Sequence, residues 1–191
     1  MRFTKKHLFW LKVAIHIIAL IPIIALFYLV LTEQVGGEPV EYIIHYTGIG
    51  GLNTLLVVLM ITPLARYFKQ GILLQTRRLI GLYVFAYAML HILAFIALDL
   101  LFEWGLFLEE ITKRPYIIVG LISFTILSLL ALTSINVIKR KMGKRWQQLH
   151  NLIYVVALLV PIHFYWSVKS EIIEPSIYIT SMLGLLGLRA W

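Results

Sequence analysis

The feature that most constrains this chain is a series of long apolar stretches joined by short polar connections. Six stretches are candidate helical spans, at residues 11–31, 48–65, 79–101, 115–138, 148–167 and 175–190. About 20 apolar residues in an α-helix cross the ~30 Å hydrocarbon core of a bilayer. With 61% hydrophobic residues and a mean hydropathy of +0.90, the chain is too apolar for a soluble domain. The sequence predicts an all-α integral membrane protein, a bundle of six transmembrane helices.

Charged residues are segregated between alternate connections. Fourteen of the 17 basic residues fall on one side of six alternating spans: Arg2, Lys5, Lys6, Lys12, Arg66, Lys69, Arg77, Arg78, Lys139, Arg140, Lys141, Lys144, Arg145 and Arg189. All nine acidic residues fall on the other: Glu33, Glu38, Glu41, Asp99, Glu103, Glu109, Glu110, Glu171 and Glu174. The positive-inside rule then places both termini in the cytoplasm. The net charge of +8 is therefore expected to flank a lipid bilayer, and nucleic acid is not expected as a partner.

Motifs of the common catalytic classes do not occur in the sequence. The chain has no cysteine, which excludes disulfides, thiolate-held clusters and cysteine-based zinc sites. It has no P-loop, HExxH or nucleophile-elbow motif. The run GIGG at residues 48–51 favours close helix packing over phosphate binding. No internal repeat stands out, and residues 1–191 are expected to form one domain. Any chemistry must therefore come from histidine.

Four histidines, His16, His91, His150 and His163, lie within the predicted spans, where ionisable residues are costly and are candidates for function. His91 precedes Asp99 by eight residues, which places it ~12 Å from the outer boundary at the helical rise per residue. His163 precedes Lys169 by six residues, ~9 Å from the same boundary. His150 follows Arg145 by five residues, ~8 Å from the inner boundary. His91 and His163 thus share a depth that His150 does not.

Two imidazoles at one depth on separate helices limit the choice of ligand. Magnesium and calcium prefer oxygen ligands, and zinc would need a third and a fourth ligand. Haem needs only two protein ligands, because the porphyrin supplies four nitrogens and its apolar faces fit between helices. The pair His91 and His163 is therefore predicted to ligate haem iron. The alternative is that each histidine makes a hydrogen bond between helices.

Several segments resemble a known family over nearly the whole chain. These are QTRRLIGLYVFAYAMLHILAF, KRPYIIVG, LALTS and GKRWQQLHNLIYVVALLVPIHFYWSVK. They resemble the haem-binding membrane subunits of bacterial protein-methionine-sulfoxide reductase systems, which belong with the ferric-reductase-like transmembrane domains. The resemblance implies a b-type haem, with His91, His150 and His163 at the positions of its metal ligands.

The resemblance also implies a role in electron transfer across the bacterial inner membrane. The acceptor would be a periplasmic molybdopterin enzyme that reduces methionine sulfoxide in proteins, and the donor a cytosolic flavin reductase or membrane quinol. FMN is a further cofactor associated with the family. The chain would be the electron-transfer subunit rather than the sulfoxide reductase. Two alternatives stay open: a ferric or oxygen reductase of the same fold, and a proton-coupled transporter, which would need carboxylates in its spans.

The sequence departs from two-haem relatives at the inner end of the third span. Arg77 and Arg78 occupy the level at which those relatives carry a second histidine, so one haem is favoured over two. His16 matches His150 in depth and is either a ligand opposite it or a polar contact between helices. Arg77 and Arg78 either set the topology or bind an anionic group, a haem propionate or a flavin phosphate, through their guanidinium groups.

Overall fold

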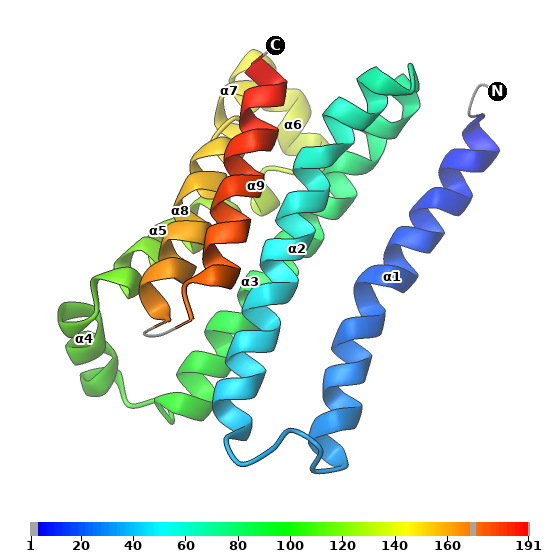
Figure 1. Cartoon of the computed structure of the whole chain (residues 1–191). Helices are drawn as coiled ribbons and strands as arrows, with labels where there is room; N and C mark the ends of the chain where they lie inside the picture. The colour runs from blue at the N-terminus through cyan, green and yellow to red at the C-terminus, as the bar shows by residue number, and fades with distance from the viewer. Residues whose placement is uncertain (1–3, 169–170, 191) are drawn as a thin grey trace. The chain divides into compact units, whose positions relative to one another are not determined.

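A computed structural model describes residues 4–168 and 171–190 of the chain, and its regular elements are helices (Figure 1). The chain divides into two compact units, residues 1–103 and residues 104–191. The expectation of one domain over residues 1–191 stays a prediction.

The first unit is built on an antiparallel pair of helices. It contains α1 (Lys5–Leu31), α2 (Pro39–Tyr67), the 3₁₀ helix η1 (Gly71–Thr76), α3 (Arg77–Ala94) and a π-helical turn η2 (Phe95–Asp99). Helices α2 and α3 lie side by side, and α1 contacts both. Leu55 and Leu59 of α2 and Ile80 and Val84 of α3 are buried. Proline at position 39 suits the first turn of α2, where its missing N–H leaves no helical bond unmade.

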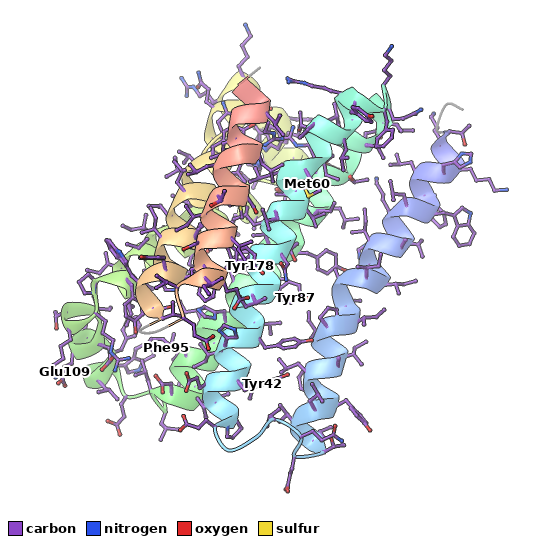
Figure 2. The ribbon with its side chains drawn as sticks, in the orientation of Figure 1. Tyr42, Met60, Tyr87, Phe95, Glu109 and Tyr178 are labelled. Carbon is purple, nitrogen blue, oxygen red and sulfur yellow. The ribbon has the colours of Figure 1, made fainter. Side chains whose placement is uncertain are left out.

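Tyr87 of α3 ties the three helices of the first unit together. Its side chain is buried, and its hydroxyl donates a hydrogen bond to the carbonyl oxygen of Ala19 in α1 (2.8 Å; Tyr87 is labelled in Figure 2). Its ring lies so close to Gly50 of α2 that a Cβ atom there would be 2.5 Å from Tyr87 Cε1. The prediction that GIGG serves close helix packing is confirmed.

The second unit contains six helices within the part of the chain that is described. They are α4 (Trp104–Lys113), α5 (Pro115–Leu132), α6 (Asn136–Met142), α7 (Lys144–His150), α8 (Ile153–Ser167) and α9 (Ile173–Ala190). Helix α8 contacts both α5 and α9, and its Val156 and Ala157 are fully buried. Gly143 separates α6 from α7 at φ 56°, a backbone conformation that favours glycine.

Within residues 4–168 and 171–190, five helical segments are long and apolar enough to cross a membrane: Lys5–Leu31, Pro39–Tyr67, Gly71–Asp99, Pro115–Leu132 and Lys144–Ser167. They correspond to the first five predicted spans, and the chain is a multi-pass membrane protein. The sixth predicted span, 175–190, is helical as α9 but is not among these five segments. Glu174 and Arg189 lie near the two ends of α9 and shorten its continuously apolar part. Six crossings and two cytoplasmic termini stay predictions.

The boundary predicted for the fourth span is wrong. We expected residues 115–138, but α5 ends at Leu132, and the Thr133 hydroxyl donates back to the carbonyl oxygen of Leu129 (2.7 Å). The apolar pattern continues through Ile135, the residue before the short helix α6, and Val137 in its first turn, and both side chains are exposed. Hydropathy alone therefore does not show where α5 ends.

Candidate functional site

His91 lies near the C-terminal end of α3 and faces α2. Its Nδ1–H donates a hydrogen bond to the carbonyl oxygen of Ile44 (2.9 Å). Gly48 lies one turn after Ile44 on the same face of α2. A Cβ atom at Gly48 would be 3.2 Å from both Cε1 and Nδ1 of His91, which is tighter than ordinary contact. The imidazole therefore lies directly against the α2 backbone.

His163 lies in α8 and faces α5 in the same manner. Its Nδ1–H donates to the carbonyl oxygen of Tyr116 (2.7 Å). Gly120 lies one turn after Tyr116, and a Cβ atom there would be 2.8 Å from Cε1 and 2.9 Å from Nδ1 of the ring. The absence of a side chain at Gly120 is what allows the imidazole to approach α5.

The two carbonyl hydrogen bonds define the tautomer of each imidazole. A backbone carbonyl only accepts, so Nδ1 must carry the proton, and in a neutral imidazole the lone pair then resides on Nε2. This is the arrangement of metal-binding histidines, which usually donate their other ring N–H to a carbonyl or a carboxylate. His91 and His163 are both oriented in this way.

His150, at the end of α7, has a different environment. Its Nε2 lies 3.1 Å from the hydroxyl oxygen of Thr133, which already donates its proton to a helix carbonyl and so accepts from the ring. The Trp146 indole stacks on the imidazole with ring centroids 3.9 Å apart, and its N–H donates to the Thr133 carbonyl. The Lys139 ammonium lies 4.4 Å from the centroid of the Trp146 ring. Here Nε2 is the protonated nitrogen.

The remaining candidates lie in the first unit. Nδ1 of His16 is 2.6 Å from the Tyr83 hydroxyl, a polar contact between α1 and α3 that matches one of the two predicted roles. Arg77 and Arg78 form the first turn of α3, and Arg66 lies in the last turn of α2. Since η1 connects these two helix ends, the three arginines gather at one end of the α2–α3 pair.

Sequence reasoning identified the histidines but missed their partners. His91 and His163 belong to different units, so their predicted pairing stays a prediction, as does a pairing of His16 with His150. Ile44, Tyr116 and Thr133 act through a carbonyl or hydroxyl oxygen and carry no chemical signature of their own. The sequence did contain one indication that Gly48 and Gly120 are equivalent: Gly120 precedes His163 by 43 residues, and Gly48 precedes His91 by the same number.

Comparison with known proteins places the chain in a family. Residues 47–161 match the family described as "Ferric reductase like transmembrane component", a stretch that includes Gly48, His91 and His150 and ends two residues before His163. The protein-methionine-sulfoxide reductase heme-binding subunit MsrQ of Salmonella dublin is 45% identical over 190 residues, which cover 99% of this chain and 96% of that protein. On both grounds the chain belongs to the MsrQ family of ferric-reductase-like transmembrane proteins.

Proposed function

We propose that this protein is the haem b subunit of a methionine-sulfoxide repair system in the bacterial inner membrane. It would pass electrons outward to a periplasmic, molybdenum-dependent reductase of oxidised proteins. The observation that carries the proposal is that His91 and His163 have the same tautomer and the same kind of hydrogen-bond partner. Each donates its Nδ1–H to a helix carbonyl and so has its lone pair on Nε2.

The donor set of the two histidines suits haem. Neutral imidazoles are the usual axial ligands of b-type haem, whose own four nitrogens complete the coordination and whose iron supplies one-electron redox chemistry. The chain's part is to hold each ring in one orientation, through the carbonyls of Ile44 and Tyr116, and to keep water away with apolar helices. The name of the MsrQ relative as a heme-binding subunit supports the same assignment.

Three arginines at one end of the α2–α3 pair are suited to bind an anionic group. Arg66, Arg77 and Arg78 gather where α2 ends and α3 begins. Guanidinium groups bind phosphate and carboxylate groups through paired hydrogen bonds. We assign to Arg77 and Arg78 the binding of a haem propionate or of the phosphate of FMN, at the side where a flavin reductase or quinol would deliver electrons.

An optical spectrum with iron quantification on the detergent-purified full chain tests the proposal. We expect a low-spin, bis-imidazole haem b at one iron per chain. After reduction, the haem should be reoxidised by the periplasmic reductase subunit together with a peptide that contains methionine sulfoxide. If a ferric chelate or oxygen alone reoxidises the haem as fast as the periplasmic subunit with its peptide does, a ferric or oxygen reductase would be favoured. Absence of haem would refute the proposal.

The predicted outer acidic residues are a further part of the proposal, as a docking surface for the periplasmic subunit. Five of these nine residues are candidates for docking, and they fall into two groups. On α4, Glu109 and Glu110 form ion pairs with Lys113 and Arg114, one turn along the chain (Glu109 is labelled in Figure 2). The hydrogen bond from Lys113 lowers the pKa of the Glu109 carboxyl below its ordinary value. Glu33, Glu38 and Glu41 instead lie exposed around the connection from α1 to α2.

Replacing Glu33, Glu38 and Glu41 together by glutamine should slow haem reoxidation by the periplasmic subunit about 10-fold at low salt, because complementary charge raises encounter rates. At 1 M salt, where the Debye length is ~3 Å, the difference should vanish. The measurement is the stopped-flow second-order rate constant. The matched control is Glu109→Gln with Glu110→Gln, which should have a smaller effect because cations on α4 already offset these carboxylates. Equal rates for the triple variant and the unmodified protein at low salt would refute docking there.

A further inference from the structure

The environments of His91 and His163 coincide in sequence spacing as well as in geometry. Each imidazole bonds to a carbonyl oxygen 47 residues earlier in the chain. In each case a glycine four residues after that carbonyl lies against the ring. The offset between the two sets is 72 residues throughout, from Ile44 to Tyr116, from Gly48 to Gly120 and from His91 to His163.

The same offset relates the packing of the helices that carry these residues. Positions 55 and 127, positions 58 and 130, and positions 84 and 156 are buried apolar residues in both units. Val57 and Leu129 are both exposed, at 46% and 45%. These four positions of the pair α2–α3 are therefore buried or exposed like their counterparts in the pair α5–α8, whereas Ala94 is buried and its counterpart Trp166 is exposed. The sequence alone showed no such repeat, because few of the corresponding residues are identical.

We propose that the chain contains a duplicated module that holds an imidazole against a helix, and that Gly48 and Gly120 are its positioning residues. The inference rests on the proposed function, in which His91 and His163 bind haem. In each module the carbonyl fixes the proton on Nδ1, and the glycine one turn later leaves room for the ring. Neither glycine touches the haem in this account; each acts through its histidine.

Alanine at either glycine would displace the ring that it faces. At Gly120 the added Cβ would lie 2.8 Å from Cε1 of His163, whereas ordinary contact begins at 3.4 Å. The ring cannot move away without stretching its 2.7 Å hydrogen bond to Tyr116 or tilting about it. At Gly48 the overlap is milder, with 3.2 Å to His91. The effect of Gly120→Ala should therefore exceed that of Gly48→Ala.

The test is the low-temperature electron paramagnetic resonance spectrum and the haem content of the purified ferric protein. Gly120→Ala should move the low-spin signal, convert part of it to high spin and lower haem affinity about 10-fold, the effect of disturbing residues that orient a metal ligand. Gly48→Ala should act in the same direction by less. Gly51→Ala is the matched control on α2, since its Cβ would lie 3.6 Å from Tyr87 and makes ordinary contact. It should leave the spectrum unchanged.

A second set of variants separates ring displacement from general damage to packing. In His163→Gly, free imidazole should restore the low-spin signal. Free imidazole should restore the signal equally in the double variant His163→Gly with Gly120→Ala, because a ring that is not attached to the chain can shift away from the added methyl group. Rescue of the single variant but not of the double variant would overturn the proposal. So would unchanged spectra in both glycine variants while the His91→Ala and His163→Ala proteins lose the signal. If the histidine variants keep the signal, the proposed function itself is wrong.

Discussion

Replacing either His91 or His163 with alanine should abolish the low-spin, bis-imidazole spectrum of the purified protein. Each variant removes the only imidazole that its helix is predicted to carry at that depth, so the haem iron would lose one of its two protein ligands. Haem that is retained should be high-spin. Haem content should fall about 10-fold or more, because loss of a ligand should cost at least as much as loss of a residue that orients one. The optical spectrum and the iron content per chain measure both effects.

His7→Ala is the matched control for these variants. The His7 ring contacts Thr4 in the first turn of α1 and has no assigned role in haem binding. This variant should keep the spectrum and the haem content of the unmodified protein. Unchanged spectra in both the His91 and the His163 variants would refute the pairing that their common depth predicts. Loss of the signal in only one of them would show that the second axial ligand is a different residue.

A common depth for His91 and His163 is predicted from the sequence because the rise of a helix per residue is fixed, and it stays a prediction. Counting from charged residues at the boundary gives the depth of a side chain without knowledge of its neighbours. The identity of those neighbours could not be obtained in this way. Ile44 and Tyr116 contribute a backbone carbonyl, and which carbonyl a histidine reaches depends on how two helices pack. The sequence predicted close packing at GIGG but not that Gly48 faces His91 and Gly50 faces Tyr87.

The span boundaries show that hydropathy does not determine where a helix ends. Apolar residues continue past the end of α5, but the Thr133 hydroxyl bonds back to the helix and Ile135 takes an extended backbone conformation. Hydropathy registers composition and not backbone direction, so it extended the fourth span to residue 138. For α9 the sixth crossing stays a prediction, because the segment is helical but Glu174 and Arg189 shorten its apolar part. The family resemblance, in contrast, rested on long quoted segments and is confirmed by the 45% identical relative.

The 72-residue offset bears on whether a second haem binds near His150. The position that corresponds to His150 in the first unit is Arg78, a residue that cannot ligate iron in its charged form. His16, the other histidine predicted at that depth, bonds to the Tyr83 hydroxyl. His150 itself directs its protonated Nε2 toward Thr133, unlike His91 and His163. The first two observations favour one haem per chain, and we propose that His150 then serves electron uptake.

Replacing His150 with alanine should therefore leave the haem content at one per chain and slow the reduction of that haem by flavin or quinol. The imidazole, the Trp146 indole and the Lys139 ammonium form one stack, and its loss should disturb how a donor is positioned, at a cost of up to about 100-fold in rate. Reduction by dithionite, which needs no docking, should be unaffected. Stopped-flow reduction with each donor, together with iron per chain, measures the two effects separately.

Two further variants decide what His150 contributes. His150→Gln keeps an N–H donor for the Thr133 hydroxyl, and Trp146→Phe keeps a ring for stacking but removes the indole bond to the Thr133 carbonyl. If the hydrogen bond to Thr133 is sufficient, the glutamine variant should restore the rate; if the stacked imidazole is required, it should not. A fall from two irons to one per chain in His150→Ala would instead show that His150 ligates an inner haem. The same fall in His16→Ala would then identify the opposing ligand, and the preference for one haem would be wrong.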